Sequence, residues 1–270
     1  MDQAMRRILT FPCAGATLAA TLDEASGKTG VLIVSGGNEI RTGSHRGMAR
    51  LAGDLAGAGF PVFRFDRRGI GDSEGDNAGF EGSAADLEAA VVAFLQHCPH
   101  VERVIGFGNC DGAAALALHG AAVDGLVIAN PWVIEPKDDM PSSATIRAHY
   151  LKRVRDPKAW ASLFAGKINL RKLASGLSRA AHSEAPSNLA TRVANGLARH
   201  DIPITILLAK GDGTAIAFAD HWETPDFEHL RAQTNIDLRR FDSSSHSFVT
   251  DIDYAFLKAA ILDQCAAKSA

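Results

Sequence analysis

Short apolar runs alternate with longer amphipathic stretches along most of this 270-residue chain. Runs of about 4–8 β-branched or apolar residues are typical of buried strands, whereas the longer stretches repeat their apolar residues with a helical period. The expected strands cover residues 31–35, 61–66, 103–108, 125–130, 202–212 and 236–242, and the expected helices cover residues 45–58, 83–97, 113–119 and 248–266. This alternation predicts an α/β fold, in which helices flank a mainly parallel sheet.

The start of the chain has two interpretations. Arg6 and Arg7 precede the stretch ILTFPCAGATLAATL, which has the basic start and apolar character of a secretion signal. Pro12 and Gly15 interrupt this stretch, and the residues on either side alternate as in two short strands, so we expect a β-hairpin rather than a targeting segment. The hairpin brings the sheet to about eight strands. No run approaches the ~20 apolar residues of a membrane span.

The alternation stops in residues 131–200, where helical patterns occur without a convincing strand. We interpret residues 131–200 as a helical cap or lid inserted into a core formed by residues 1–130 and 201–270. Residues 137–200 hold 12 Lys and Arg against 4 Asp and Glu. This basic block is either a solvated helical surface or a lid that attracts an anionic substrate, carrier or surface.

Composition excludes several classes of function. The net charge of −3 at pH 7 and the pI of about 6.4 lack the electrostatic footprint that nucleic-acid binding needs. The four cysteines, Cys13, Cys98, Cys110 and Cys265, have no C-x-x-C spacing, which argues against a zinc site and a disulfide framework. We therefore expect reduced thiols in a cytoplasmic protein that uses no metal and no cofactor.

A literal G-x-S-x-G motif occurs at residues 71–75 and nominates Ser73 as a nucleophile. In enzymes that use this motif, the serine stands on a sharp turn from a strand into a helix. An acidic, glycine-rich loop surrounds Ser73 instead, and no helix pattern follows it, so we do not expect it to be the nucleophile. Arg67, Arg68 and Asp72 are expected to hold this loop by ion pairs.

The sequence RVIGFGNCDGAAALAL, residues 103–118, does have the strand–turn–helix context of a nucleophile elbow in an α/β-hydrolase fold. Small residues surround Cys110, as a strained turn requires, and a helix N-terminus beneath it favours a thiolate. We therefore predict that Cys110 is the nucleophile. The alternative is an inert buried thiol, which Asp111 favours because a neighbouring negative charge disfavours a thiolate.

A cysteine nucleophile needs a base and usually an orienting acid, and in this fold the chain order is nucleophile, acid, histidine. His246 lies in the loop SSSHSF after the last expected strand, and Asp212 lies in the loop KGDGTA after the preceding one. We predict that they complete a triad with Cys110. Asp220 and Asp242 are alternatives for the acid.

The oxyanion hole of such a site combines two backbone N–H groups. One belongs to Asp111, the residue after the nucleophile, and the other to the glycine-rich loop after the strand at residues 31–35, where we expect Asn38 to be the donor. His45 and Arg46, in the motif GSHR, are expected to begin a helix beside this loop. They either contact substrate there, or the motif serves only the helix, with Ser44 as its cap.

The motifs GGNEIRTGSHR, FRFDRRGIGDSEG, GNCDGAAA, IEPK, KGDGTA and SSSHSF, in this order, resemble the α/β-hydrolases associated with exosortase A systems, the first of the two hydrolase types found there. The resemblance covers most of the chain and matches Cys110, Asp212 and His246 to the triad positions. It implies a cytoplasmic bacterial hydrolase, encoded near functions in exopolysaccharide production and protein sorting, with no settled substrate. The loop GGNEIR departs from the family, which has a proline and an aromatic residue there.

These observations predict a Cys-His-Asp hydrolase that cleaves an ester, thioester or lactone through an acyl-enzyme intermediate. The substrate is expected to be a small molecule or a carrier-linked acyl group, and an anionic one if the basic block attracts it. Three alternatives stay open: an acyltransferase, an enzyme similar to dienelactone hydrolases, which also use a cysteine elbow, and a non-catalytic binding protein on a hydrolase scaffold.

Overall fold

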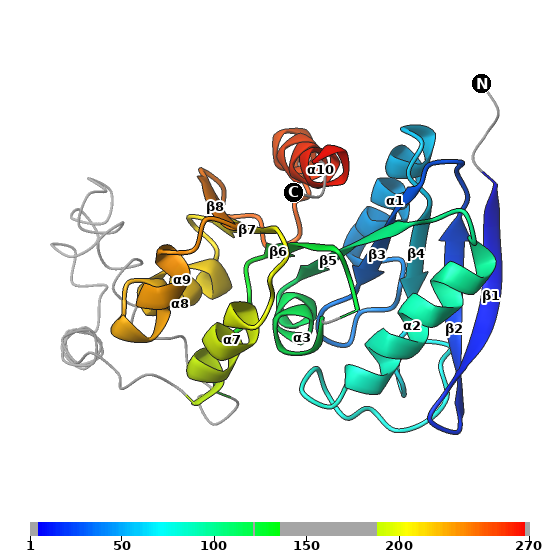
Figure 1. Cartoon of the computed structure of the whole chain (residues 1–270), viewed down its shortest axis with the longest axis horizontal. Helices are drawn as coiled ribbons and strands as arrows, with labels where there is room; N and C mark the ends of the chain where they lie inside the picture. The colour runs from blue at the N-terminus through cyan, green and yellow to red at the C-terminus, as the bar shows by residue number, and fades with distance from the viewer. Residues whose placement is uncertain (1–4, 121, 136–187, 268–270) are drawn as a thin grey trace, which may run out of the picture.

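An eight-stranded sheet forms the centre of the protein, as Figure 1 shows. The computed structural model describes residues 5–120, 122–135 and 188–267. The strands are β1 (Arg6–Cys13), β2 (Ala16–Asp23), β3 (Thr29–Val34), β4 (Val62–Phe65), β5 (Arg103–Asn109), β6 (Gly125–Ala129), β7 (Ile204–Ala209) and β8 (Ile236–Phe241). They lie in the order β1-β2-β4-β3-β5-β6-β7-β8. The predicted α/β class and the predicted number of strands are confirmed.

The sheet is parallel from β4 to β8 in this spatial order, and β2 is the one strand of the described sheet that runs in the opposite direction. Strands β1 and β2 pair antiparallel from Arg6 opposite Asp23 to Cys13 opposite Ala16. The turn between them consists of Ala14 and Gly15, with φ of 48° and 84°. Positive φ at both central residues is what a type I′ hairpin turn requires. The predicted hairpin is therefore confirmed.

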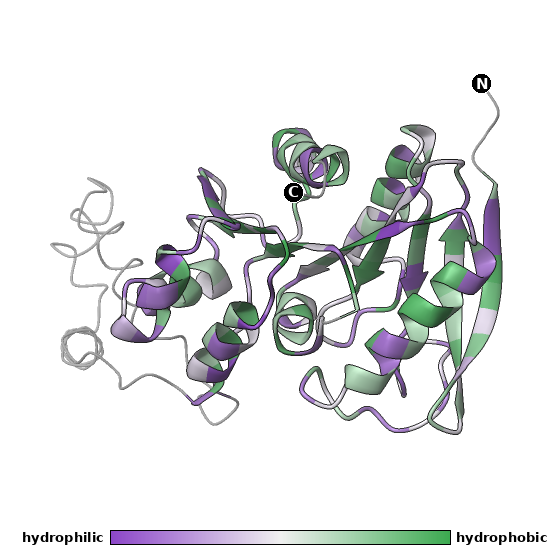
Figure 2. Ribbon diagram, in the orientation of Figure 1, coloured by the Kyte–Doolittle hydropathy of each residue, from purple (hydrophilic) through white to green (hydrophobic). Residues whose placement is uncertain are grey.

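Helices cover both faces of the sheet (Figure 1). The described helices are α1 (Gly47–Gly57), α2 (Ala84–His97), α3 (Asp111–His119), α7 (Asn188–Ala198), α8 (Gly213–Trp222), α9 (Glu228–Arg231) and α10 (Asp251–Ala266), with short 3₁₀ segments η1 (Ser44–Arg46) and η2 (Pro225–Phe227). Helices α1 and α10 pack on one face, and α2, α3 and α7 pack on the other. The doubly covered sheet explains why its central strands are apolar on both sides (Figure 2).

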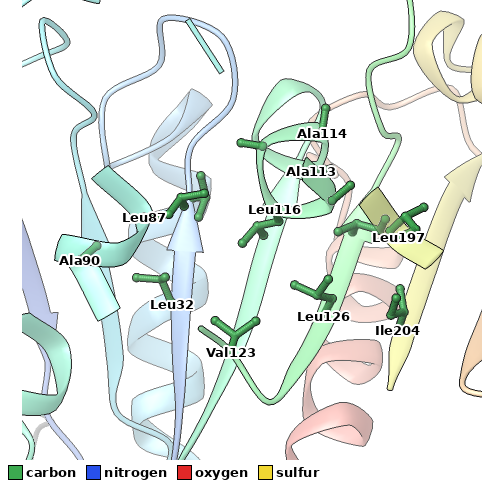
Figure 3. Packing of buried hydrophobic residues seen from close by; sticks show 14 of the residues in the cluster. Leu32, Leu87, Ala90, Ala113, Ala114, Leu116, Val123, Leu126, Leu197 and Ile204 are labelled. Atoms are coloured by element: carbon green, nitrogen blue, oxygen red, sulfur yellow. The ribbon is translucent and has the colours of Figure 1, made fainter. Parts of the chain in front are cut away.

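The core between the sheet and helices α2, α3 and α7 holds the buried leucines and alanines seen in Figure 3. Fully burying a leucine contributes about 1.5–3 kcal/mol, so this layer is a main source of stability. The alanines of α3 let that helix approach its neighbours closely. A Cβ on Gly196 of α7, for instance, would lie 2.4 Å from the carbonyl oxygen of Ala117 in α3.

The expected helix over residues 45–58 begins later than predicted. His45 and Arg46 have φ of 52° and 60°, and α1 starts only at Gly47. Left-handed φ values interrupt a right-handed helix, so these two residues form a tight turn that aims the chain into α1. The prediction that they open the helix was therefore wrong.

Much of the predicted cap, residues 131–200, lies outside the described residues. Helix α7, near the end of that range, packs against α3 and shares the core of the sheet. The division into a core and a cap stays a prediction. In the part of the chain that the structure covers, every helix is too short or too polar to span a lipid bilayer.

Strand β3 lies between β4 and β5, so the chain winds in opposite directions on its two sides. In open parallel sheets, ligands bind beyond the carboxyl ends of the strands at such a switch point. The loop after β3 and the turn after β5 meet at this edge. The fold therefore predicts a ligand site between these two segments.

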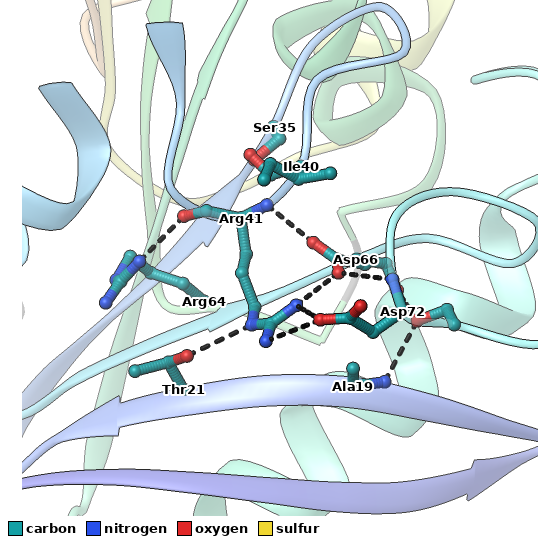
Figure 4. Close-up of polar contacts among 9 residues, drawn as sticks. Ala19, Thr21, Ser35, Ile40, Arg41, Arg64, Asp66 and Asp72 are labelled. Carbon is teal, nitrogen blue, oxygen red and sulfur yellow. Dashed lines mark hydrogen bonds and ion pairs between the residues drawn. The ribbon is translucent and has the colours of Figure 1, made fainter. Parts of the chain in front are cut away.

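A buried charge network anchors the loop after β3 (Figure 4). The backbone N–H of Arg41 donates to Asp66 at 2.5 Å, and the guanidinium of Arg41 pairs with the same carboxylate. Arg64 donates to the carbonyl of Arg41 at 2.8 Å, and Arg41 also pairs with Asp72 at 3.0 Å. Asp66 is fully buried at the end of β4, whereas the Asp72 side chain is 76% exposed.

We expect Asp66→Ala to lower the free energy of unfolding by about 3–5 kcal/mol, because it leaves the largely buried Arg41 guanidinium with only the exposed Asp72 as an acidic partner. The matched control, Asp72→Ala, removes an exposed partner of the same arginine and should lower it by about 0–1 kcal/mol. Urea denaturation measures both values. Equal losses in the two variants would contradict the anchoring role of Asp66.

Candidate active site

Cys110 stands on a strained turn between β5 and α3. Its backbone has φ 58° and ψ −123°, a conformation that residues other than glycine rarely adopt. Two backbone hydrogen bonds hold the turn. The N–H of Cys110 donates to the carbonyl of Ala129, the last residue of β6, at 3.0 Å, and the N–H of Trp132 donates to the carbonyl of Cys110 at 3.1 Å. Such strain persists where surrounding structure enforces it, and it is concentrated at functional sites.

Glycines on both sides make room for this turn. A Cβ on Gly108 would lie 2.6 Å from the backbone of Gly112, and a Cβ on Gly112 would lie 2.5 Å from the carbonyl oxygen of Val34. No larger residue fits at either position without a backbone shift. The small residues that the sequence shows around Cys110 thus have a steric cause.

The side chains of Cys110, Asp212 and His246 come together at the carboxyl edge of the sheet. His246 Nδ1 lies 2.9 Å from Asp212 Oδ1, and the Cys110 side chain lines the same pocket as the imidazole. The second carboxylate oxygen of Asp212 accepts the N–H of Ala215 at 2.9 Å and so caps α8. One carboxylate oxygen is therefore fixed by the helix, and the other orients the imidazole.

Two hydrogen bonds raise the pKa of His246 to about 10. The bond to Asp212 contributes most, the bond to Cys110 comes next, and partial burial opposes both. A ring with this pKa is protonated at neutral pH. An imidazolium beside a sulfur atom stabilises the thiolate, which is the nucleophilic form.

The other predicted candidates for the acid lie elsewhere. Asp220 is an exposed residue within α8, and Asp242 is exposed directly after β8. The carboxylate that contacts His246 is that of Asp212, which is 8% exposed. Asp212 is thus the acid that this geometry supports.

Cys110 differs from the other three cysteines, all of which the structure describes. Cys13, Cys98 and Cys265 are buried, whereas Cys110 is half-buried. Burial raises the pKa of Cys13 to about 11, with a hydrogen bond to Asp86 adding to the shift, and it raises that of Cys265 to about 12. These three thiols are poor nucleophiles at neutral pH.

A pocket of about 130 Å³ opens beside Cys110 and His246. Its walls also include Val34, Gly36, Gly37, Glu39, Ser44 and Met48. The loop after β3 contributes most of these residues, and both apolar and polar groups line the pocket. Such a combination suits a small molecule or the reactive end of a larger one.

The predicted oxyanion donors lie at this edge of the sheet. Asp111 opens α3, so its backbone N–H follows the elbow directly. Asn38 belongs to the loop after β3, and its side-chain oxygen accepts a hydrogen bond from Asn77 at 3.0 Å. Within that loop, Gly36 and Gly37 line the pocket. The role of Asn38 as donor stays a prediction.

His45 and Arg46 are both exposed, in the left-handed turn described above. Ser44, their neighbour, lines the pocket. A substrate contact by His45 or Arg46 therefore requires a substrate that extends beyond the pocket.

Ser73 has a structural position. Its hydroxyl donates to the carbonyl of Asp66 at 2.7 Å and accepts the N–H of Ala19 at 2.9 Å, so it ties its loop to β2. The expected ion pairs of this loop are present: Arg68 with Asp86, Arg67 with Asp111 and Asp72 with Arg41.

Two asparagines that the sequence analysis missed connect the site. Asn109, next to Cys110, donates to the carbonyl of His246 at 3.0 Å and accepts from Asn130 at 3.3 Å. Asn130 is fully buried with φ 43°, and its side-chain oxygen accepts the N–H of Ala209 at 3.0 Å. The signal in the sequence was an asparagine at the end of an apolar strand in each case. The described residues contain no cluster of metal-ligating side chains.

Solved structures with this fold include several hydrolases. The esterase Pf2001 of Pyrococcus furiosus has a TM-score of 0.66 and 16% identity over 96% of this chain and 89% of its own. Est1E of Butyrivibrio proteoclasticus, solved with ferulic acid bound, has a TM-score of 0.60 and 15% identity over 96% and 100%. The alpha/beta hydrolase GrgF of a Penicillium species has a TM-score of 0.60 and 18% identity over 97% and 98%.

A search of the curated proteins gave no match. The model of one protein family, described as the alpha/beta hydrolase family, matches residues 31–255, which run from within β3 past β8 and include the elbow and the catalytic candidates. The chain therefore belongs to the alpha/beta hydrolase family and is, on that membership, a hydrolase.

Proposed function

We propose that the protein hydrolyses an ester, thioester or lactone with a Cys110–His246–Asp212 triad. The observation that carries this proposal is the position of Cys110 on the strained elbow, in one pocket with an imidazole whose Nδ1 contacts Asp212 at 2.9 Å. Nucleophile, base and orienting acid in this arrangement are sufficient for covalent acyl transfer.

In the first step, the Cys110 thiolate attacks the substrate carbonyl carbon and forms a tetrahedral intermediate. Backbone N–H groups of Asp111 and of the loop after β3 stabilise the oxyanion. The intermediate collapses to a thioester on Cys110 as the bond to the leaving group breaks. His246 donates its proton to the departing oxygen or sulfur, which leaves the imidazole neutral.

In the second step, neutral His246 takes a proton from water, and the resulting hydroxide attacks the thioester. Collapse of this second intermediate releases the carboxylic acid and returns the thiolate and the imidazolium. Asp212 accepts the Nδ1–H throughout, so Nε2 is the nitrogen that exchanges protons. If an alcohol or amine replaced water, the same intermediate would support acyl transfer.

The pocket and the chemistry narrow the class of substrate. A volume of about 130 Å³ next to the sulfur suits a short acyl group, with the rest of the substrate outside. Thiolates attack esters and thioesters more readily than amides, which supports a small-molecule or carrier-linked acyl substrate over a peptide. The sequence motifs that resemble the exosortase A-associated hydrolases support a cytoplasmic member of that group.

We expect Cys110→Ala to abolish hydrolysis of p-nitrophenyl esters and acyl thioesters. His246→Ala should lower kcat by about 10²–10⁴-fold, because the general acid and base is lost. Steady-state kinetics on a panel of acyl chain lengths, with iodoacetamide labelling mapped by mass spectrometry, measures both effects. Cys110 should be labelled before Cys13, Cys98 and Cys265.

Ser73→Ala is the matched control, because Ser73 stands in the literal G-x-S-x-G motif and yet serves the structure. This variant should keep the wild-type kcat at temperatures below its unfolding transition. Loss of activity in the folded Ser73→Ala protein, or an inert Cys110 in a wild-type protein without activity, would overturn the proposal in favour of a different nucleophile or a binding role.

The pKa of His246 predicts a pH dependence for unactivated alkyl esters, whose alkoxide leaving groups need a proton. After subtraction of the rate with Cys110→Ala, kcat/KM should fall as the pH rises through about 10, where His246 loses its proton. In Asp212→Asn the largest cause of the raised pKa is gone, so the fall should move to lower pH. An unchanged profile in Asp212→Asn would show that Asp212 does not control the imidazole.

A further inference from the structure

We infer that Asp111 and Arg67 are positioning residues that fix the oxyanion loop, residues 35–38, against the nucleophile elbow. The inference rests on the proposed function, since it assigns the pair a role in that reaction. It also explains why an acidic residue follows a cysteine that must work as an anion.

Asp111 and Arg67 bind the N–H and the carbonyl group of the same residue, Gly37. The carboxylate of Asp111 accepts the backbone N–H of Gly37, and Nη2 of Arg67 donates to the carbonyl oxygen of Gly37 at 2.6 Å. Gly37 has φ +57°, and a Cβ there would meet nothing within 4 Å. Because Gly37 has no side chain whose packing could restrain it, these two hydrogen bonds hold its conformation.

The guanidinium of Arg67 is directed at the loop rather than at its acidic partner. Arg67 is 4% exposed, and its contacts with the Asp111 oxygens are 3.4 and 3.5 Å, longer than its contact with Gly37. Its Nη1 is buried without a hydrogen-bond partner among the described residues. A buried donor left unpaired costs about 1–3 kcal/mol, so this arrangement is poor for stability alone.

The same contacts connect the two halves of the oxyanion hole. Asp111 supplies its own backbone N–H from the start of α3, while its side chain restrains the loop opposite. Gly36, beside Gly37, is so close to the elbow that a Cβ on it would lie 3.4 Å from Cys110 Cβ and 2.5 Å from Asn109 O. Donors held in place before the reaction stabilise an oxyanion best, because they need not reorganise.

Arg67 also balances the charge of Asp111 at close range, with its Nη2 3.4 Å from Oδ1 of Asp111. The pair therefore adds no net charge beside the elbow, although an acidic residue directly follows Cys110.

The test compares two reactions of the same sulfur. Hydrolysis passes through an oxyanion, whereas alkylation by iodoacetamide does not. In Asp111→Ala we expect kcat for an acyl thioester to fall by up to about 10²-fold through misplacement of the donors, with KM little changed. Alkylation of Cys110 should be as fast as in the wild type or faster, since a negative charge has been removed. Asp111→Asn keeps an oxygen for the Gly37 N–H and should restore most of kcat.

Asp86→Ala is the matched control. Asp86 also lies in the first turn of a helix and pairs with an arginine, Arg68, next to Arg67 in the chain, but it does not touch the oxyanion loop. It should lower the melting temperature and leave the ratio of hydrolysis to alkylation unchanged. Both rates are measured below the unfolding transition of each variant.

Three results would overturn the inference. Unchanged kcat in Asp111→Ala, or an equal fall in hydrolysis and alkylation, would show that Asp111 does not position the oxyanion loop while leaving the triad intact. A wild-type protein that neither hydrolyses the panel nor reacts at Cys110 would overturn the proposed function as well, so the two failures are distinguishable.

Discussion

The strained backbone of Cys110 is the constraint on which the rest of the site depends. Holding a residue with a side chain at φ 58° costs of order 1–3 kcal/mol, so the turn exists only because its surroundings enforce it. Gly108 and Gly112 leave space for it, and the end of β6 anchors it through Ala129. The alanines of α3 follow from the same requirement, because the helix that leaves the elbow must run close to the sheet.

Charged side chains, rather than apolar packing, determine the shape of the loop that faces the elbow. Asp66 and Arg67 are consecutive residues after β4, and each holds a different point of the loop after β3: Asp66 through Arg41, and Arg67 through Gly37. Buried charges contribute little net stability compared with apolar residues of the same size. Their hydrogen bonds are directional, however, and an apolar contact could not fix the orientation of a single peptide group.

The sharp turn at Cys110 and the proximity of Cys110, Asp212 and His246 could be predicted, because the turn depends on contiguous residues and the three residues follow the chain order expected for this fold. The strand, the small residues, the cysteine and the alanine-rich helix are contiguous in the sequence. Ser73 lacks this context, and the structure confirms that it does not stand on a strand-to-helix turn. The links through Asn109 and Asn130 could not be predicted, since they join segments that are distant in the chain; the bond from Asn109 to His246 spans 137 positions. The left-handed turn at His45 was missed because local propensity favours continuing the helix.

Asp212 divides its carboxylate between two tasks, with one oxygen on the N-terminus of α8 and the other on His246. Orientation of the imidazole is therefore coupled to the integrity of the first turn of that helix. Helix ends open locally with far smaller free energies than the whole domain. Fraying of the first turn of α8 would release the carboxylate and let the imidazole turn away, so moderate heating would break the contact between Asp212 and His246 before it unfolded the sheet.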